Sequence, residues 1–305
     1  MLKLKEPIFI LSAQRSGSTL LRIMLDRIPG IVGLPETSFW SFKKSHGKLD
    51  PADPSQRADI ARRWVQYFTV KKWDVDHAKL EEELIEKADT WAKVFELTVA
   101  RYVEDAGIAW FEESVICEKT PAHIHKQLSI LEDYPDARFI YLVRDPRDQA
   151  ASLKKCPWST SNMYVIARVW RSGIRSIGTN PNSITIRYED LVRETEATFY
   201  RLTDFLRKEV AYEDVKDPDS RQRVGLGHQK VERHGKALQA VSDKSISKWR
   251  QGLSRPDKDL QVIQYVCEKE MTQFGYALEP YEKSIAVHAR ICYGRLGLLL
   301  SKISL

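Results

Sequence analysis

Short hydrophobic runs alternate with helical patterns along the chain. Four runs are typical of buried strands because they are short and uninterrupted and lead into polar residues; they are residues 8–12, 115–117, 138–143 and 183–187. Residues 19–28 instead carry hydrophobic side chains at helical spacing, and this pattern stops at Pro29 and Gly30. Strands that alternate with helices predict an α/β fold, with a doubly wound parallel sheet flanked by helices.

The interval between the first two predicted strands departs from this alternation. Residues 31–40 are short and extended, whereas residues 51–110 have Trp, Tyr, Phe and Leu at helical intervals. We expect residues 51–110 to form a helical insertion that packs on the core and contributes to an acceptor pocket. Residues 1–280 then form a single domain.

Residues 281–305 have the pattern of a basic amphipathic helix. Hydrophobic residues such as Val287 and Leu298 are interleaved with Arg290, Arg295 and Lys302. We expect such a helix to pack on its own domain or on a second subunit, which would make it a dimerisation element. The alternative is a peripheral membrane contact that serves a lipid-linked acceptor.

The overall charge favours an anionic ligand and argues against nucleic acid as a partner. The 305 residues include 48 basic and 42 acidic side chains, with a net charge of +6, and the basic residues are dispersed. No hydrophobic run is long enough to span a membrane, and the first residues do not read as a secretory signal. The four cysteines are far apart and lack metal-ligand spacing. We therefore expect a cytoplasmic protein without a metal site.

A candidate phosphate-binding loop follows the first predicted strand. Gly17 allows an anion to approach the backbone closely, and Arg15 supplies a permanent positive charge. The helix that follows presents free amides and a partial positive charge at its N-terminus. The predicted ligand contacts are Arg15, Ser16, Gly17, Ser18 and Thr19. A kinase or NTPase that uses ATP and Mg²⁺ remains an alternative, although the loop is shorter than a P-loop and lacks its lysine.

A second candidate anion site follows the third predicted strand. Arg144 ends this strand, and Ser152 lies about two turns into the next helix, which Asp145 and Pro146 begin. An arginine fork beside a hydroxyl suits a separate phosphate. Because the carboxyl ends of parallel strands share one edge of a sheet, the two sites together predict a ligand with two separated phosphates.

Two further candidate residues follow the second and fourth predicted strands. These are Lys119 and Tyr188, which we expect at the same edge of the sheet. His123 and His125 lie close to Lys119 in the sequence. They are interpreted as residues of a helix surface or of the acceptor pocket, because no acidic or Cys partner has the spacing of a metal site.

These segments resemble the sulfotransferases that use 3′-phosphoadenosine-5′-phosphosulfate (PAPS). Residues 14–21 are similar to their 5′-phosphosulfate loop, and residues 143–148, with Ser152, are similar to their 3′-phosphate motif. Residues 186–192 and 247–249 are similar to two further segments of the tyrosylprotein branch.

The resemblance implies a P-loop-like fold and places more residues near the nucleotide. It covers residues 7–250 approximately, and it implies that Tyr188 and Lys248 lie close to PAPS. One position departs from the tyrosylprotein pattern, because Cys156 stands where those enzymes have another arginine after Ser152.

The resemblance also implies a reaction. A sulfuryl group would move from PAPS to a hydroxyl of an acceptor, releasing 3′-phosphoadenosine-5′-phosphate (PAP), without a metal. Glu36 falls where this branch carries its catalytic glutamate and would take the hydroxyl proton. Lys119 and Arg15 would stabilise the developing negative charge, and Arg144 with Ser152 would anchor the 3′-phosphate.

The acceptor and a non-enzymatic alternative stay open at this point. Small-molecule, carbohydrate, lipid and peptide hydroxyls all fit the implied reaction. A non-catalytic nucleotide-binding protein would use Arg144 and Ser152 but would have no need for Glu36 or Lys119 in the site.

Overall fold

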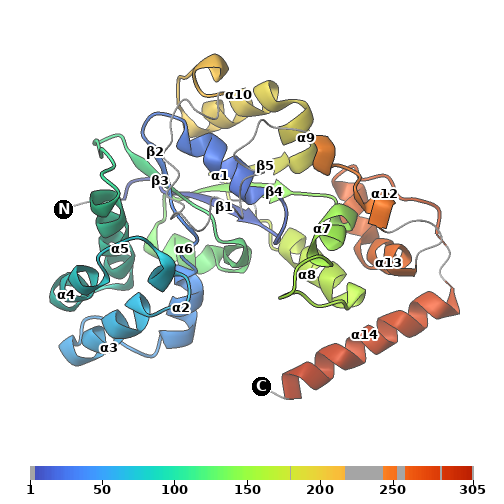
Figure 1. Ribbon diagram of the computed structural model, residues 1–305, viewed down its shortest axis with the longest axis horizontal. Helices are drawn as coiled ribbons and strands as arrows, with labels where there is room; N and C mark the ends of the chain where they lie inside the picture. The colour runs from blue at the N-terminus through green and yellow to red at the C-terminus, as the bar shows by residue number, and fades with distance from the viewer. Residues whose placement is uncertain (1–3, 179, 217–242, 253–257, 282–283, 304–305) are drawn as a thin grey trace.

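A five-stranded parallel sheet forms the centre of the protein (Figure 1). The computed structural model describes residues 4–178, 180–216, 243–252, 258–281 and 284–303. The strand order is β2-β3-β1-β4-β5, and every neighbouring pair is parallel. The strands are β1 (Ile8–Ser12), β2 (Ile31–Gly33), β3 (Val115–Glu118), β4 (Arg138–Val143) and β5 (Ser183–Arg187).

The two faces of the sheet carry separate hydrophobic cores. On β1, Ile8 and Ile10 pack with helices α1 (Ser18–Asp26) and α10 (Thr195–Leu206). The intervening Phe9 and Leu11 belong to the other core, with residues of α2 (Phe39–His46) and α5 (Trp91–Asp105). Side chains of a strand alternate between its two faces, so an uninterrupted apolar run is what a strand covered on both sides requires. The predicted α/β sheet with helices on both faces is confirmed.

Within residues 31–46, the sequence pattern missed one strand and one helix. The four predicted strands are present at the predicted positions, but β2 lies within residues 31–40, which were expected only to be extended. Three residues are too few to show a period of two. The extended prediction is wrong at its end, because Ser38 adopts a left-handed φ of 56° and α2 begins at Phe39.

Helices fill the interval predicted as a helical insertion. They are α3 (Pro54–Val65), the 3₁₀ turn η1 (Val70–Lys72), α4 (His77–Lys87) and α5. Asp53 caps α3 by accepting hydrogen bonds from the amides of Ser55 and Gln56, both at 2.9 Å. Buried aromatic side chains join this region to α2, with Phe39 and Trp64 at a centroid distance of 5.3 Å. The predicted helices are confirmed, whereas their part in an acceptor pocket stays a prediction.

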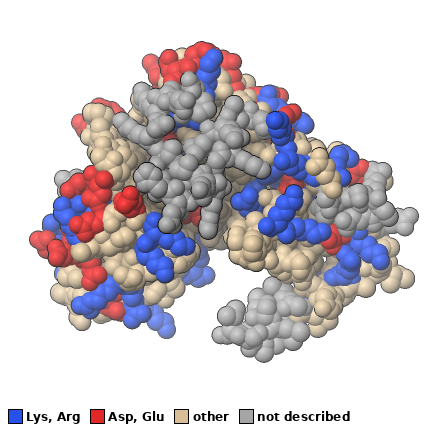
Figure 2. All heavy atoms as spheres, in the orientation of Figure 1, with Lys and Arg blue, Asp and Glu red and all other residues tan. Residues whose placement is uncertain are grey.

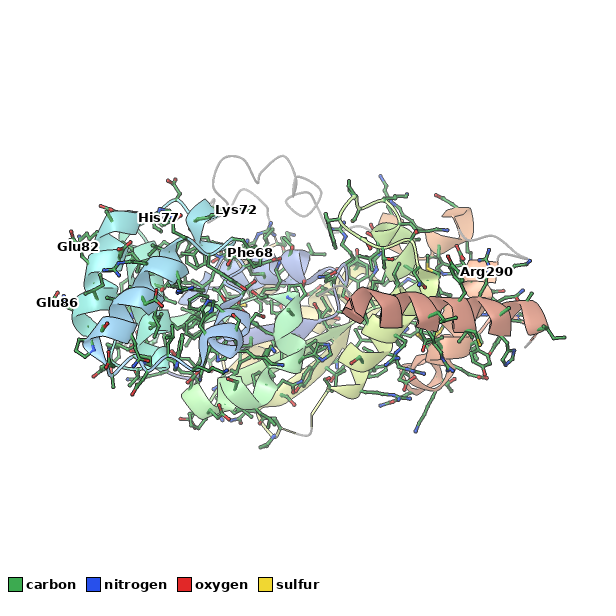
Figure 3. The ribbon with its side chains drawn as sticks, turned by 90° about the horizontal axis from the view of Figure 1, so that it is seen from below. Phe68, Lys72, His77, Glu82, Glu86 and Arg290 are labelled. Atoms are coloured by element: carbon green, nitrogen blue, oxygen red, sulfur yellow. The ribbon has the colours of Figure 1, made fainter. Side chains whose placement is uncertain are left out.

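The C-terminal helix packs on its own chain over the first part of its length. Val287 and Ile291 of α14 (Ile285–Ile303) are buried in the core that α8 (Met163–Arg175) and α13 (Lys258–Gln273) form. Arg295 donates a 3.1 Å hydrogen bond to the Tyr164 hydroxyl. Figure 3 shows α14 as a long rod along one side of the molecule. Its first turns therefore pack on the same chain, whereas the predicted contacts with a second subunit or a membrane stay predictions.

The remaining elements connect these parts of the fold. They are α6 (Gln127–Asp133), α7 (Pro146–Leu153), α9 (Tyr188–Arg193), α12 (Trp249–Gly252), and the 3₁₀ turns η2 (Pro121–His125), η3 (Tyr212–Asp214) and η4 (Asp243–Ser245). Among the described residues, no helix combines the length and the apolar character that crossing a membrane demands.

Candidate active site

The predicted anion-binding residues follow neighbouring strands. Arg15 comes after β1, Lys119 after β3, Arg144 after β4, and Tyr188 directly after β5. Since all four strands are parallel, these residues share the carboxyl edge of the sheet. The central strand β1 has β3 on one side and β4 on the other, so the connections leave in opposite directions there. The edge above β1 is therefore the position at which a ligand of such a sheet binds.

The loop after β1 has no room for a β-carbon at Gly17. Arg15 and Gly17 both have positive φ angles, of 63° and 91°. A β-carbon on Gly17 would lie 2.4 Å from two carbons of the Tyr188 ring. Tyr188 therefore packs directly on the loop backbone, whereas its place near a nucleotide stays a prediction. The Ser16 hydroxyl is buried and has no hydrogen-bond partner among the described residues, so it is available to a ligand.

Arg144 connects the loop after β4 with the loop after β1. Its Nη1 donates to the Arg15 carbonyl oxygen at 2.9 Å, and its guanidinium carbon lies 4.4 Å from the centroid of the Tyr188 ring. Its Nη2 donates to the carbonyl oxygen of Ser245 at 2.7 Å, while Nε is buried without a partner among the described residues. One guanidinium group thus organises three segments that are distant in the sequence.

The two predicted anion sites are in direct contact. Nε of Arg15 donates a 3.1 Å hydrogen bond to the hydroxyl of Ser152 on α7. The prediction assigned Arg15 to the 5′ end of a nucleotide and Ser152 to the 3′-phosphate. In this structure the two predicted sites therefore adjoin each other, with Arg15 of the first in contact with Arg144 and Ser152 of the second.

A carboxylate holds the segment that contains Lys248. Asp148 of α7 accepts hydrogen bonds from the amides of Ser247, at 2.7 Å, and Trp249, at 2.9 Å. Burial raises the pKa of Asp148, although the amide of Trp249 and the charge of Arg144 oppose this shift. Lys248 lies between the two clamped amides and is exposed. The sequence did not identify Asp148 as a site residue.

Glu36 and Lys119 form an ion pair at the same edge of the sheet. Oε1 of Glu36 contacts Nζ of Lys119. The Lys119 side chain is only 5% exposed, whereas that of Glu36 is 45% exposed. A molecule in solution can therefore reach the carboxylate, while the ammonium approaches from inside the protein. The structure brings together Glu36, which the resemblance implies as the base for the acceptor hydroxyl, and Lys119, which it implies near the transferred group; both roles stay predictions.

The segment around η1 is anchored to the backbone beside Glu36. Thr69 donates from its hydroxyl to the carbonyl oxygen of Thr37 at 2.5 Å, and Nε1 of Trp73 donates to that of Glu36 at 3.4 Å. Phe68 and Lys72, labelled in Figure 3, come from this same segment and are exposed. The segment anchored beside Glu36 therefore carries an exposed aromatic ring and an exposed cation.

Glu118 forms a buried hydrogen-bond network behind the ion pair. It accepts hydrogen bonds from the hydroxyls of Thr37, at 2.9 Å, and Thr120, at 2.5 Å. The Nδ1 atom of His123 lies 2.9 Å from its other carboxylate oxygen. The His123 side chain is completely buried, so the expectation that it lies on a helix surface is wrong, whereas a place in the acceptor pocket is not tested. One sequence signal could have identified Glu118, because it is a carboxylate that directly follows the buried run 115–117.

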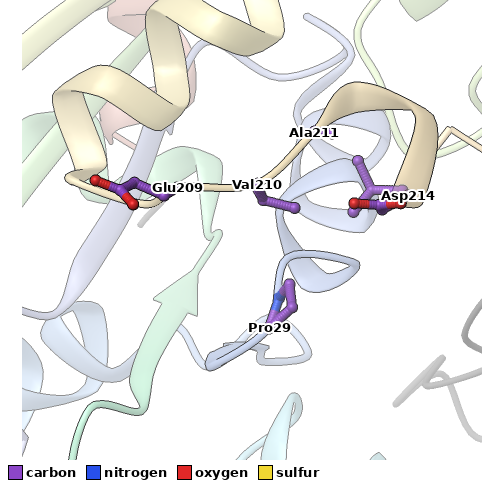
Figure 4. Close-up of a pocket in the computed structure, with 6 residues that line it drawn as sticks. Pro29, Glu209, Val210, Ala211 and Asp214 are labelled. Carbon is purple, nitrogen blue, oxygen red and sulfur yellow. The ribbon is translucent and has the colours of Figure 1, made fainter.

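The distribution of charged side chains and the lining of a pocket elsewhere distinguish this edge of the sheet. Figure 2 shows Lys and Arg side chains gathered on the part of the visible face where α7 lies, and acidic side chains over α10. A pocket of about 540 Å³ lies near the opposite edge of the sheet and is lined by Pro29, Glu209, Val210, Ala211, Asp214 and Val215 (Figure 4). Its two carboxylates do not suit an anion. Among the described residues, no group of three His, Cys, Asp or Glu side chains has a metal-binding arrangement.

Solved structures with this fold include domains from two biosynthetic systems. The sulfotransferase domain from the Synechococcus PCC 7002 olefin synthase has a TM-score of 0.62 and 22% identity, covering 91% of this chain and 98% of that one. The sulfotransferase domain from the curacin biosynthetic pathway has a TM-score of 0.56 and 22% identity, covering 91% and 100%. No curated protein sequence matches the chain. A family model described as the sulfotransferase family matches residues 7–214, which is more than half of the sequence. The chain therefore belongs to the sulfotransferase family of enzymes.

Proposed function

We propose that the protein transfers a sulfuryl group from PAPS to a hydroxyl group of an acceptor. The observation that carries this proposal is the contact of Arg15 with both Arg144 and Ser152 at the edge where parallel α/β sheets bind ligands. It joins a helix N-terminus, two guanidinium groups and the Ser152 hydroxyl into a surface suited to a nucleotide with phosphates at both ends.

Each part of the donor has a matching part of this surface. The backbone amides and hydroxyls of residues 15–19 would hold the 5′-phosphosulfate, and the Ser16 hydroxyl has no hydrogen-bond partner among the residues that the structure describes. Arg144 and Ser152 would hold the 3′-phosphate, for which Arg15 would release the Ser152 hydroxyl. Tyr188 would contact the nucleotide, and Lys248 would approach it from the segment that Asp148 clamps.

The Glu36–Lys119 pair supplies the chemistry. Glu36 would accept the proton of the acceptor hydroxyl while the hydroxyl oxygen attacks the sulfur atom of PAPS. The bond from sulfur to the bridging oxygen of the 5′-phosphate breaks, and its electron pair stays on PAP. Lys119 and Arg15 would stabilise the negative charge on the sulfuryl and phosphate oxygens. The proton ends on Glu36, and PAP and the sulfated acceptor leave.

The acceptor is proposed only as a class. A small-molecule, carbohydrate, lipid or peptide hydroxyl could reach Glu36 past Phe68 and Lys72. The proposed partners through α14, a membrane surface or a second copy of the chain, stay predictions, as does the cytoplasmic location.

A screen of hydroxyl compounds tests this function. The full chain is incubated with PAPS labelled in its sulfuryl group and with panels of phenols, sugars, fatty alcohols and peptides. We expect one panel to yield a product heavier by one sulfuryl group, formed together with PAP, and Glu36→Gln to abolish it. A thermal-shift comparison separates the alternatives. Stabilisation by ATP with Mg²⁺ and none by PAP would contradict the proposal and favour a kinase.

A further inference from the structure

Glu118 is a buried carboxylate to which the proposed reaction assigns no step. It has no exposed surface, and a carboxylate in that position needs hydrogen-bond donors to offset its loss of water. The structure provides them from three residues. Oε1 receives the Thr37 and Thr120 hydroxyls and the Thr37 amide, at 2.9, 2.5 and 3.3 Å. Oε2 receives the amide of Thr120 at 3.1 Å and faces His123 at 2.9 Å.

The partners of Glu118 are the chain neighbours of the reacting pair. Thr37 follows Glu36 directly, and Glu118 directly precedes Lys119. The hydrogen bonds between Thr37 and Glu118 therefore connect the backbones of the two residues whose side chains form the ion pair. A shift of either backbone would change the distance between the carboxylate and the ammonium.

Other contacts make this connection rigid. The Thr120 hydroxyl accepts hydrogen bonds from the amides of Thr37, at 3.2 Å, and Ser38, at 3.1 Å. His123 packs its ring against Trp40, with centroids 5.1 Å apart, and Trp40 is itself fully buried. The loop that carries Glu36 thus has its next two residues fixed from the end of β3.

We propose that Glu118 is a positioning residue that, through Thr37 and Thr120, fixes the Glu36–Lys119 pair in its reacting geometry. The inference rests on the proposed function, which gives the pair its role in the reaction. The hydrogen bonds of Glu118 with Thr37 and Thr120, called the clamp below, can be tested without any sulfated product. If the clamp loosens, Glu36 and Lys119 separate, Lys119 becomes accessible, and the attack geometry deteriorates.

The first test measures how fast Lys119 reacts with trace acetic anhydride. Peptide mass spectrometry of the full chain gives the rate for Lys119 relative to exposed Lys71. In Thr37→Val, which keeps the shape but removes the hydroxyl, we expect the Lys119 rate to rise at least about threefold, the scale of a weakened ion pair. Thr37→Ser retains the hydroxyl and is expected to keep the wild-type rate.

A matched control separates positioning from general destabilisation. Thr98 is another buried threonine, whose hydroxyl accepts from Trp64 Nε1 at 2.8 Å and donates to the Val94 carbonyl at 2.7 Å, away from the site. Thr98→Val should destabilise the protein without changing the Lys119 rate. An unchanged rate in Thr37→Val, or an equal rise in Thr98→Val, would overturn the proposal.

A second test uses turnover with the acceptor identified in the screen. We expect kcat to fall about 100-fold in Thr37→Val, the effect of a misplacement of about 1 Å, with PAP affinity unchanged and activity retained in Thr37→Ser. A loss in PAP affinity that accounts for the whole defect would contradict a positioning role. Full activity of Glu36→Gln would instead refute the proposed base, while the labelling result for Thr37→Val would still decide whether the clamp exists.

Discussion

Arg144 donates a 2.9 Å hydrogen bond from Nη1 to the carbonyl oxygen of Arg15. This bond joins the loops after β4 and β1, which are 129 positions apart in the chain. The same guanidinium stacks on Tyr188 after β5 and reaches Ser245. The cationic edge is therefore a built assembly of four segments, and its properties can be tested one residue at a time.

Substitution of Arg144 should weaken nucleotide binding. Arg144→Lys keeps the charge but cannot donate two directed hydrogen bonds while stacking on Tyr188, so it should lose part of the affinity. Arg144→Ala should lose about 1.5–3 kcal/mol of PAP binding free energy, measured by titration calorimetry. Arg171→Ala serves as the control, because Arg171 bonds to the Val266 carbonyl on the outer helices. Equal affinities in Arg144→Ala and the control would refute the anchoring role.

Gly17→Ala should disrupt the phosphate loop by steric overlap as well as by backbone strain. Its β-carbon would lie 2.4 Å from the ring of Tyr188, and Gly17 has a φ of 91°. Gly107 provides a matched control, because it has a φ of 61° but nothing within 4 Å of an added β-carbon. Both substitutions should cost about 1–2 kcal/mol of unfolding free energy through strain.

The steric overlap should appear as an additional loss of unfolding free energy in Gly17→Ala that Gly107→Ala does not show. We expect its PAP affinity to fall and Tyr188→Ala to cancel the steric part in a double-mutant cycle. Urea unfolding and calorimetry give the two quantities. Additive effects of Gly17→Ala and Tyr188→Ala would show that the ring does not rest on the loop.

Glu118 should make the stability of the protein depend on acid pH. Burial acts to raise the pKa of Glu118, but the charge of His123 and the hydrogen bonds from His123, Thr120 and Thr37 outweigh it and lower the pKa below its ordinary 4.5. A lowered pKa contributes stability that is present above the unfolded value and is lost as the pH falls through the folded value. Urea unfolding between neutral pH and about pH 3 should therefore show a smaller acid loss in Glu118→Gln than in wild type. Parallel pH profiles for the two proteins would contradict this assignment.

Asp148 should support nucleotide binding by fixing the backbone of residues 247–249. Asp148→Ala removes the acceptor of the Ser247 and Trp249 amides, so Lys248 should lose its fixed position. The loss of these two hydrogen bonds should lower the free energy of unfolding by about 1–3 kcal/mol. We also expect weaker PAP binding by calorimetry, because the segment must then be ordered when PAP binds. Asp59→Ala is the control, since Asp59 pairs with Arg63 within α3. Identical affinities for PAP in the two variants would exclude a role for the clamped segment.

The first turns of α14 should contribute to the stability of the fold. Ile291 is 4% exposed in the core with α8 and α13, whereas Ile285 on the same helix is 88% exposed. Ile291→Ala should reduce the free energy of unfolding by about 2–4 kcal/mol, and Ile285→Ala by less than about 0.5 kcal/mol. Chemical denaturation measures both. A neutral Ile291→Ala would mean that α14 does not dock on its own chain in solution.

The hydrophobic pattern was sufficient to locate most of the sheet and the cationic edge. Each buried run marked a strand, and parallel connections then required Arg15, Lys119, Arg144 and Tyr188 to share one edge. The pattern could not locate β2, because three residues between turns carry too little periodicity.

Contacts between distant segments lay beyond the sequence. Nothing local indicates that Arg15 bonds to Ser152, 137 positions away, or that Glu118 finds its donor in Thr37, 81 positions earlier. A carboxylate at a strand end is usually exposed, and only the folded donors make its burial possible. The same tertiary network explains why His123 is in the interior.

The proposed function requires that the carboxyl edge of the sheet holds both phosphate ends of the donor. Titration calorimetry of the full chain with PAP and with adenosine 5′-monophosphate, which lacks the 3′-phosphate, measures this directly. We predict that PAP binds more tightly by about 1.5–3 kcal/mol, and that this difference disappears in Arg144→Ala. Equal affinities for the two nucleotides in the wild-type protein, or no binding of PAP, would contradict the account.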